Sequence, residues 1–222
     1  MCGRFTLSST PEDIAQTFDL HQRPDLVPRF NVAPAQLVAV VALKGDGRTR
    51  GLAQLRWGFV PYWAQAPSVG PRPINARAET VAYKPPFDHA FRSRRCLIPA
   101  DGFFEWAKVG TRKVGHHFRL KAGGVMAFAG VWDVWKAEGQ PTLATCAIIT
   151  VEANELVRPF HDRMPAVIPP EQFDRWMGFG TPVDELLGAL RPLPAEQLEV
   201  VRVSPAVNKV ANDTPECVAP AA

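Results

Sequence analysis

The sequence predicts a single α+β domain in which strands predominate and the helices are short and peripheral. Three observations lead to this prediction. Most apolar runs are short and bounded by turn residues, as strands are. Signals for a helix start are few, and the 22 prolines are scattered singly or in short pairs, as in a loop-rich fold. No internal repeat or clear linker divides the 222 residues, a length that suits one substantial core.

The first element is a short helix that begins after Thr10. Thr is a favourable N-cap, Pro11 fits the first helical position, and acidic residues follow in the first turn. The apolar run 37–43 then predicts a strand, which the turn 44–47 connects to a second strand near 51–57. Further strands are expected at 95–99, 102–106, 116–121, 125–132, 143–151, 164–168 and 199–203.

The remaining segments are assigned by their turn and helix signals. The glycine pair at 123–124 is typical of a hairpin turn. Segments 170–177 and 183–190 carry helical signals, and 62–93 is expected to be an irregular surface excursion. We expect one domain over residues 2–210, followed by a flexible tail at 211–222.

Composition excludes several classes of protein. The net charge of +3 and the pI of about 8.8 are compatible with a nucleic-acid partner but too weak to imply one, and the basic run at 91–95 is typical of a solvated face. The four cysteines lack zinc-site spacing, so no metal or cofactor is expected. There is no secretory signal and no apolar run near the ~20 residues of a membrane span, which predicts a cytoplasmic protein.

Cys2 has a chemistry that no internal cysteine shares. Methionine is normally trimmed before a small second residue, and removal of Met1 would leave an α-amine and a thiol on adjacent carbons. Both groups have reference pKa values that make their nucleophilic forms accessible near neutral pH. An aldehyde condenses with the amine to an imine, and the thiol then closes a five-membered thiazolidine in an effectively unimolecular step. The alternative is that a second-position cysteine is chance.

Three further positions carry polar groups suited to chemistry. Asn75 offers a donor and an acceptor that could orient a sugar oxygen, although a turn or cap role is the common alternative. Glu105 lies in an aromatic strand, where a carboxylate needs either a partner or a raised pKa; a structural salt bridge is equally compatible. His161 lies beside Asp162 and could transfer protons near neutral pH.

Aromatic and proline residues at 57–63 follow Arg56 and could stack against unpaired bases. At least one of these tryptophans is expected to be core instead.

Taken together and in this order, the motifs resemble the SOS-response-associated peptidase family, whose members process abasic sites in DNA. The resemblance spans roughly residues 2 to 210. It rests on residues 1–5 (MCGRF), 30–34 (FNVAP), 57–61 (WGFVP), 74–79 (INARAE), 95–100 (RCLIPA), 102–106 (GFFEW) and 161–165 (HDRMP).

The resemblance implies a β-barrel-like core and a basic groove that takes single-stranded DNA containing abasic sites. It implies that Cys2 is the covalent nucleophile, Glu105 the acid–base residue, Asn75 the residue that senses the abasic sugar, and His161 the residue that promotes the imine. The DNA contacts are then expected from Arg4, Arg77, Arg163, Trp57 and Trp106.

The expected product is a thiazolidine crosslink that shields the lesion, with reversal by the same groups and with peptidase activity directed at Met1. A monomer is expected. Two rivals stay open. An N-terminal-nucleophile amidohydrolase would use the same Cys, Glu and His on a peptide or amide, and a non-covalent single-strand binder would need no nucleophile at all.

Overall fold

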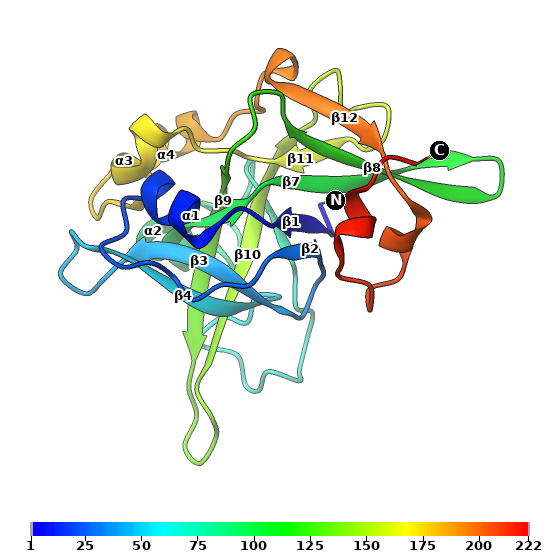
Figure 1. Ribbon diagram of the computed structural model, residues 1–222. Coiled ribbons are helices and arrows are strands. Elements are labelled where there is room, and N and C mark those ends of the chain that lie inside the picture. The colour runs from blue at the N-terminus through cyan, green and yellow to red at the C-terminus, as the bar shows by residue number, and fades with distance from the viewer. Residues whose placement is uncertain (1, 222) are drawn as a thin grey trace.

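The computed structural model describes residues 2–221, and Met1 and Ala222 lie outside the described part of the chain. It confirms a mixed fold of sheets with a few short helices (Figure 1). The strands of the first sheet are β1 (Phe5–Leu7), β2 (Arg29–Val32), β7 (Gly102–Val109), β8 (Arg112–Leu120) and β12 (Leu198–Arg202). Those of the second are β3 (Leu37–Leu43), β4 (Arg50–Trp57), β5 (Asn75–Arg77), β6 (Arg95–Ala100), β9 (Met126–Trp135), β10 (Leu143–Glu152) and β11 (Arg163–Pro165).

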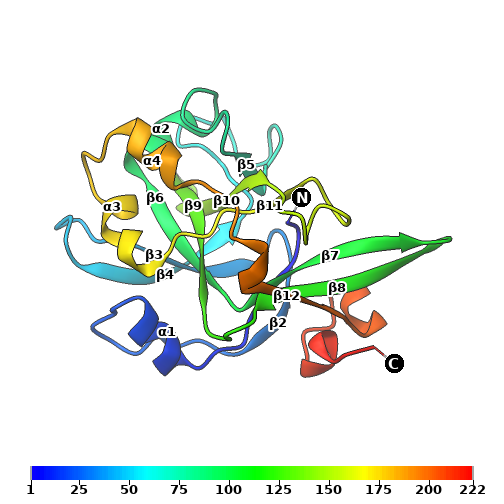
Figure 2. The same ribbon diagram turned by 90° about the horizontal axis from the view of Figure 1, so that it is seen from above.

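The helices are short and gather at the end of the molecule opposite the projecting β7–β8 hairpin (Figures 1 and 2). They are α1 (Pro11–Thr17), α2 (Asp88–Ser93), α3 (Phe173–Met177) and α4 (Val183–Ala189). Single 3₁₀ turns lie at η1 (Pro170–Gln172), directly before α3, and at η2 (Ala195–Gln197), η3 (Pro205–Asn208) and η4 (Pro215–Val218). The helix predicted after Thr10 is confirmed as α1: the Thr10 side chain accepts a hydrogen bond from the Asp13 amide at 3.1 Å.

The second sheet curves back on itself. Its strands follow the order β11-β10-β4-β3-β6-β9, and β9 also pairs with β10, which returns the path to its second strand. This closed circuit of strands is the part of the fold that most resembles the barrel-like core expected from the family resemblance. The first sheet has the order β12-β8-β7-β1-β2 and is antiparallel throughout.

The core lies between the two sheets and is rich in phenylalanine. Phe5 of β1 packs edge-on against Trp57 and Phe128 of the second sheet, at ring-centroid distances of 5.3 and 6.0 Å. Phe103 of β7 stacks on Phe118 of β8 at 5.1 Å. All five side chains are buried, and each contributes on the order of 1.5–3 kcal/mol by leaving water. The core therefore ties β1 firmly to both sheets.

A glycine and an aspartate fix the junction between β1 and β7. A Cβ at Gly102 would lie 2.3 Å from the His117 ring and 2.5 Å from the Phe118 carbonyl oxygen, so only glycine fits there. The Asp101 carboxylate accepts hydrogen bonds from the hydroxyls of Ser8 and Ser9, at 2.8 and 2.6 Å, and from both backbone amides. These contacts hold the end of β1 against the start of β7.

The structure corrects three sequence-based predictions of local structure. The turn at Gly123 and Gly124 does not form a hairpin, because both edges of β8 are already occupied by β7 and β12, and the chain crosses to the other sheet. The segment 62–93, expected to be irregular, contains β5 and α2.

The expected flexible tail is the third correction. Within 211–221, Cys217 is buried, the Ala221 amide donates to Arg202, and Asp213 pairs with Arg29. The C-terminal segment is therefore packed onto the domain as far as it is described.

Candidate active site

The N-terminal residues are held by the edges of β2 and β7. Phe5 pairs with Val32 on one side and with Phe103 on the other, and the Phe104 amide donates to the Arg4 carbonyl at 3.0 Å. This pairing places Cys2 in the segment that leads into β1, and Figure 2 shows that segment between β7 and β11. Cys2 is fully buried. The burial is consistent with the strand pairing, since β1 is an inner strand of the first sheet with β7 on one side and β2 on the other.

Asn75 fixes the backbone of Cys2. Its side-chain Nδ2 donates to the Cys2 carbonyl at 3.0 Å. Asn75 is the first residue of β5, which pairs in parallel with β10 opposite Ile148. The Asn75 Oδ1 is buried and accepts no hydrogen bond from any described residue. A buried amide oxygen normally accepts a hydrogen bond. The Asn75 Oδ1 can therefore accept one from a donor group on a ligand.

Glu105 is a buried carboxyl next to Cys2. It lies on β7, is 5% exposed and is paired in register with His116 of β8. Burial, together with the negative charge of Asp162, raises its pKa to about 7. Near neutral pH the carboxyl is therefore divided between its acid and base forms, which suits a group that both gives and takes protons.

The thiol of Cys2 is held in its protonated form. Burial raises the pKa of Cys2 well above its ordinary value, and the negative charge of Glu105 raises it further. The thiolate is therefore not preformed, and a base must remove the thiol proton during any reaction at sulfur.

His161 lies in the loop that precedes β11. Its Nδ1 accepts a hydrogen bond from the Arg163 amide at 2.9 Å and lies 2.8 Å from the Asp162 carboxylate. In the neutral ring this bond leaves the proton on Nε2, while in the protonated ring Nδ1 would donate to Asp162. Burial lowers the pKa of His161, with Asp162 acting in the opposite direction. The neutral ring, a donor through Nε2, is therefore favoured near pH 7.

The four predicted reactive residues thus belong to one cluster, linked pair by pair. Asn75 is hydrogen-bonded to Cys2, Glu105 acts electrostatically on Cys2, and Asp162 acts on both Glu105 and His161. They come from β5, from the segment that precedes β1, from β7 and from the loop before β11. Only the folded chain brings them together.

The five residues expected to contact DNA have different environments. Arg77 is exposed and Trp106 is half-buried. Arg4 is partly buried and donates to the Asn31 side chain at 2.7 Å and to the Val207 carbonyl at 2.9 Å.

Two of these five positions differ from the expectation. Trp57 is fully buried, packs on Phe5 and donates its indole N–H to the Ile74 carbonyl at 2.8 Å, so it offers no face to a base. Arg163 is 7% exposed, and its guanidinium is bonded to both oxygens of Glu79 and to the Thr150 carbonyl. In this structure Arg163 braces the loop of His161 rather than facing solvent.

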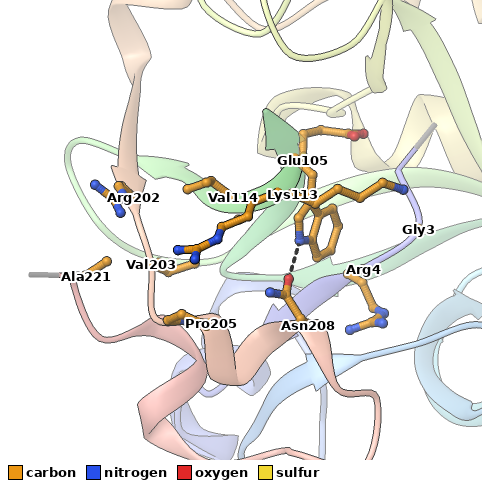
Figure 3. A pocket seen from close by; sticks show the side chains of 13 residues that line it. Gly3, Arg4, Glu105, Lys113, Val114, Arg202, Val203, Pro205, Asn208 and Ala221 are labelled. Carbon is orange, nitrogen blue, oxygen red and sulfur yellow. Dashed lines mark hydrogen bonds between the residues drawn. The ribbon is translucent and has the colours of Figure 1, made fainter. Parts of the chain in front are cut away.

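Two cavities adjoin the cluster, and the sequence reasoning missed most of their basic residues. One, of about 500 Å³, lies beside Asp162 and is lined by Arg77, Arg158 and Arg163. The other, of about 810 Å³, lies beside Glu105 (Figure 3). Its lining includes Arg112, Lys113 and Arg202, which belong to no motif in the sequence. A prediction of the β7–β8 hairpin would have placed Arg112 and Lys113 close to Glu105, but the sequence analysis did not predict that hairpin.

Two further findings concern residues 2–221. They contain no group of three or more His, Cys, Asp or Glu side chains that could hold a metal ion. None of their helices is both long and apolar enough to cross a membrane.

The fold and this N-terminal site define a class of protein. The chain matches the model of the SOS response associated peptidase (SRAP) family over residues 1–210, and it belongs to that family.

Two relatives match nearly the whole chain. Abasic site processing protein YoqW of Bacillus subtilis is 40% identical, with 98% of this chain and 99% of YoqW covered. Abasic site processing protein YoaM of the same organism is 39% identical, covering 97% and 96%. A solved structure of a protein from Bacteroides thetaiotaomicron covers both chains completely with a TM-score of 0.89 at 22% identity, a likeness that concerns the fold.

Proposed function

We propose that this protein processes abasic sites in single-stranded DNA by forming a covalent thiazolidine with the sugar through Cys2. The observation that carries the proposal is the cluster itself: an N-terminal cysteine whose backbone is fixed by Asn75 and whose thiol lies in the field of Glu105. The names of the relatives, which are abasic site processing proteins, support the choice of lesion.

The reaction begins with the sugar. An abasic deoxyribose is mostly a closed hemiacetal, and only its open form carries an aldehyde. Glu105, with a pKa of about 7, can exchange the proton between the anomeric hydroxyl and the ring oxygen. The buried Asn75 Oδ1 accepts a hydrogen bond from a sugar hydroxyl.

The amine of Cys2, freed by removal of Met1, then attacks the aldehyde carbon. A C–N bond forms, and loss of one water from the carbinolamine gives the imine. The proton that the attacking amine releases charges the His161 ring, and the imidazolium, stabilised by Asp162, protonates the departing hydroxyl.

Sulfur reacts last, because burial keeps the Cys2 thiol protonated until a base acts on it. Glu105 in its ionised form takes the thiol proton, the S–C bond forms at the imine carbon, and the ring nitrogen gains a proton. No oxidant or cofactor is consumed, and the reverse sequence releases the aldehyde. We propose in addition that the same cluster supports removal of Met1, which lies outside the described residues.

The test is a denaturing gel of the Met1-trimmed protein mixed with an oligonucleotide bearing one abasic site. A heat-stable shifted band that requires both the lesion and Cys2 supports the proposal. Cys2→Ala keeps an α-amine, so it should still give a reducible imine and strand cleavage but no stable band. A heat-stable crosslink from Cys2→Ala would overturn the role of the thiol. Hydrolysis of peptides without DNA would favour the amidohydrolase instead.

A further inference from the structure

The loop that carries His161 connects β10 to β11 over residues 153–162. The Ala153 amide donates to the Asp162 carbonyl at 2.9 Å, which closes the two ends of the loop against each other, and the His161 amide donates to the Val157 carbonyl at 3.1 Å. Both bonds lie within the loop. They fix its shape and its attachment to the second sheet, but not its position relative to the first sheet.

Phe160, which directly precedes His161, packs this loop onto the first sheet. Its ring centroid lies 4.6 Å from that of His116 and 5.2 Å from that of Phe118, and both partners belong to β8. Phe118 is fully buried, and Phe160 and His116 are half-buried. Aromatic pairs have preferred geometries and are worth more than the area they bury, so these contacts hold the loop at a defined place on β8.

His116 links this contact to Glu105. The two residues lie directly opposite each other in the antiparallel pairing of β7 with β8, so their side chains are neighbours on one face of the sheet. The His116 Nδ1 donates to the Val114 carbonyl at 3.1 Å, because that oxygen can only accept, and the bond orients the ring. The strand neighbour of Glu105 thus contacts the chain neighbour of His161.

Glu105 and His161 come from different sheets, yet the proposed reaction needs both of them at one sugar. Glu105 exchanges protons with the sugar and the thiol, and His161 protonates the departing hydroxyl. Rates of this kind depend strongly on position, since a displacement of about 1 Å can cost on the order of 100-fold. A contact that bridges the two sheets beside both residues is therefore suited to set their separation.

We infer that His116 and Phe160 are positioning residues for the proposed reaction: their ring contact holds the His161 loop against β8, so that His161 and Glu105 act on the same abasic sugar. This inference rests on the function proposed above. Neither ring exchanges a proton with the substrate, and the effect of both on the rate passes through His161.

The test uses two substitutions that separate the ring of His116 from its hydrogen bond. His116→Phe keeps a ring against Phe160 and loses the Nδ1 donor, whereas His116→Asn keeps an amide N–H close to the Nδ1 position and loses the ring. Phe160→Ala removes the contact from the other side. The matched control is Phe179→Ala, which removes an exposed phenylalanine ring from the loop between α3 and α4.

The rate of covalent capture is measured in single turnovers at saturating abasic DNA, with cyanoborohydride present so that imine and thiazolidine are both counted. His116→Asn and Phe160→Ala should be about three- to tenfold slower than the parent, the range that one aromatic pair supplies, with an unchanged DNA concentration for half-maximal rate. His116→Phe and Phe179→Ala should match the parent.

The same substitutions in a His161→Ala background test the route of the effect. If the contact acts through His161, neither His116→Asn nor Phe160→Ala slows this variant further. An equal loss in both backgrounds would overturn the inference, and so would a His116→Phe protein as slow as His116→Asn.

An NMR titration of His161 distinguishes failure of this inference from failure of the proposed function, since it needs no DNA. Burial lowers the pKa of His161 from its ordinary 6.5, while Asp162 raises it and Arg163 lowers it. Release of the loop exposes the ring to water, so its pKa should move towards 6.5 in Phe160→Ala and His116→Asn and stay at the parent value in His116→Phe. A parent that captures no abasic DNA would refute the chemistry, whereas an unchanged titration in Phe160→Ala and His116→Asn would overturn the positioning role.

Discussion

Burial has different consequences for the two reactive groups at the N-terminus. It keeps the thiol of Cys2 protonated, yet it brings the carboxyl of Glu105 to a pKa of about 7, where acid and base forms coexist. The same low-polarity environment therefore keeps the thiol protonated and gives Glu105 the pKa that the proposed mechanism requires of its base. This arrangement favours an order of reaction in which the amine attacks first and the thiol closes the ring.

Glu105→Gln should change the pH dependence of stability. The carboxyl titrates at about 7 in the folded chain against an ordinary 4.5, so folding favours its protonated form. The resulting stability is fully present below 4.5 and is lost as the pH rises through 7. The neutral glutamine avoids that loss. Thermal unfolding should give the variant a higher Tm than the parent at pH 8.5 and a similar Tm at pH 4.5.

Glu79→Gln provides the opposite sign as a control. The hydrogen bonds from Arg163 lower the pKa of Glu79, so its contribution is present above its ordinary pKa and lost as the pH falls. This variant should be less stable than the parent at pH 8.5, with a smaller deficit in acid. A Glu105→Gln Tm difference that is the same at both pH values would contradict a raised pKa.

Asn75→Asp should slow crosslinking with little change in DNA affinity. The substitution keeps the shape of the side chain but replaces the donor to the Cys2 carbonyl by a second acceptor. Loss of one hydrogen bond, at about 1 kcal/mol or somewhat more, predicts roughly a tenfold lower rate. Single-turnover kinetics at saturating abasic DNA measure this rate. An unchanged rate would mean that the bond is not needed to position Cys2.

The contribution of the C-terminal segment to the fold cannot be recognised from the sequence. Asp213 pairs with Arg29 and accepts from the amides of Phe30 and Asn31, the latter at 2.9 Å. Asn31, in turn, donates to the carbonyls of Val207, Lys209 and Asn212 and accepts from Arg4. β2 and the C-terminal segment thus fix each other, and both support the wall of the larger cavity.

Asp213→Ala should therefore destabilise the whole domain. Loss of charge-assisted bonds predicts about 1.5–3 kcal/mol, which corresponds to a Tm lower by several degrees at roughly 2–4 °C per kcal/mol for a chain of this size. Differential scanning calorimetry measures it. Glu216→Ala, which removes an exposed carboxylate nearby, is the control and should leave the Tm unchanged. Equal Tm values for both variants would mean that the segment contributes nothing to stability.

These elements also show where sequence reasoning succeeds. The start of α1 could be predicted because Thr10, Pro11 and the following acids act on one another within a single turn. The packing of the C-terminal segment could not, since the partners of Asp213 lie more than 180 residues away. The turn at Gly123 and Gly124 indicates a change of direction, but not which sheet receives the next strand.

The site shows the same limit. The motifs identify Cys2, Asn75, Glu105 and His161 as candidates, and the fold brings all four into one cluster. A tryptophan beside an arginine, however, gives the same sequence pattern whether its side chain is buried or exposed, and Trp57 is buried in the core. The basic cavity could not be found, because its residues become neighbours only through the hairpin and the docked C-terminal segment.

For the molecule as a whole, the site depends on how the two sheets meet. Two of the reactive residues belong to the first sheet: Cys2 precedes β1, and Glu105 lies on β7. The other two belong to the second sheet: Asn75 lies on β5, and His161 lies in the loop before β11. Chemistry at Cys2 therefore requires the two sheets to be packed together. Loss of that packing should abolish crosslinking before it abolishes the strands.

The exposed Arg77 offers a test of DNA binding beyond the reactive cluster. Arg77→Ala should weaken binding of single-stranded DNA to a similar extent for all sequences and make the log–log salt slope less steep by about 0.7, the effect of one lost phosphate contact. Fluorescence anisotropy over a salt series measures both quantities. A weakening confined to particular base sequences would instead indicate that Arg77 contacts a base.

The central claim is that the Cys2 aminothiol captures the aldehyde of an abasic site, and intact mass spectrometry of the crosslink tests it most directly. The Met1-trimmed protein is incubated with an abasic oligonucleotide and analysed without reducing agent. The account predicts an adduct at the summed mass less one water, attached at Cys2, stable to heat and absent from Cys2→Ala. An adduct attached at another residue, or no adduct from protein shown to lack Met1, would contradict it.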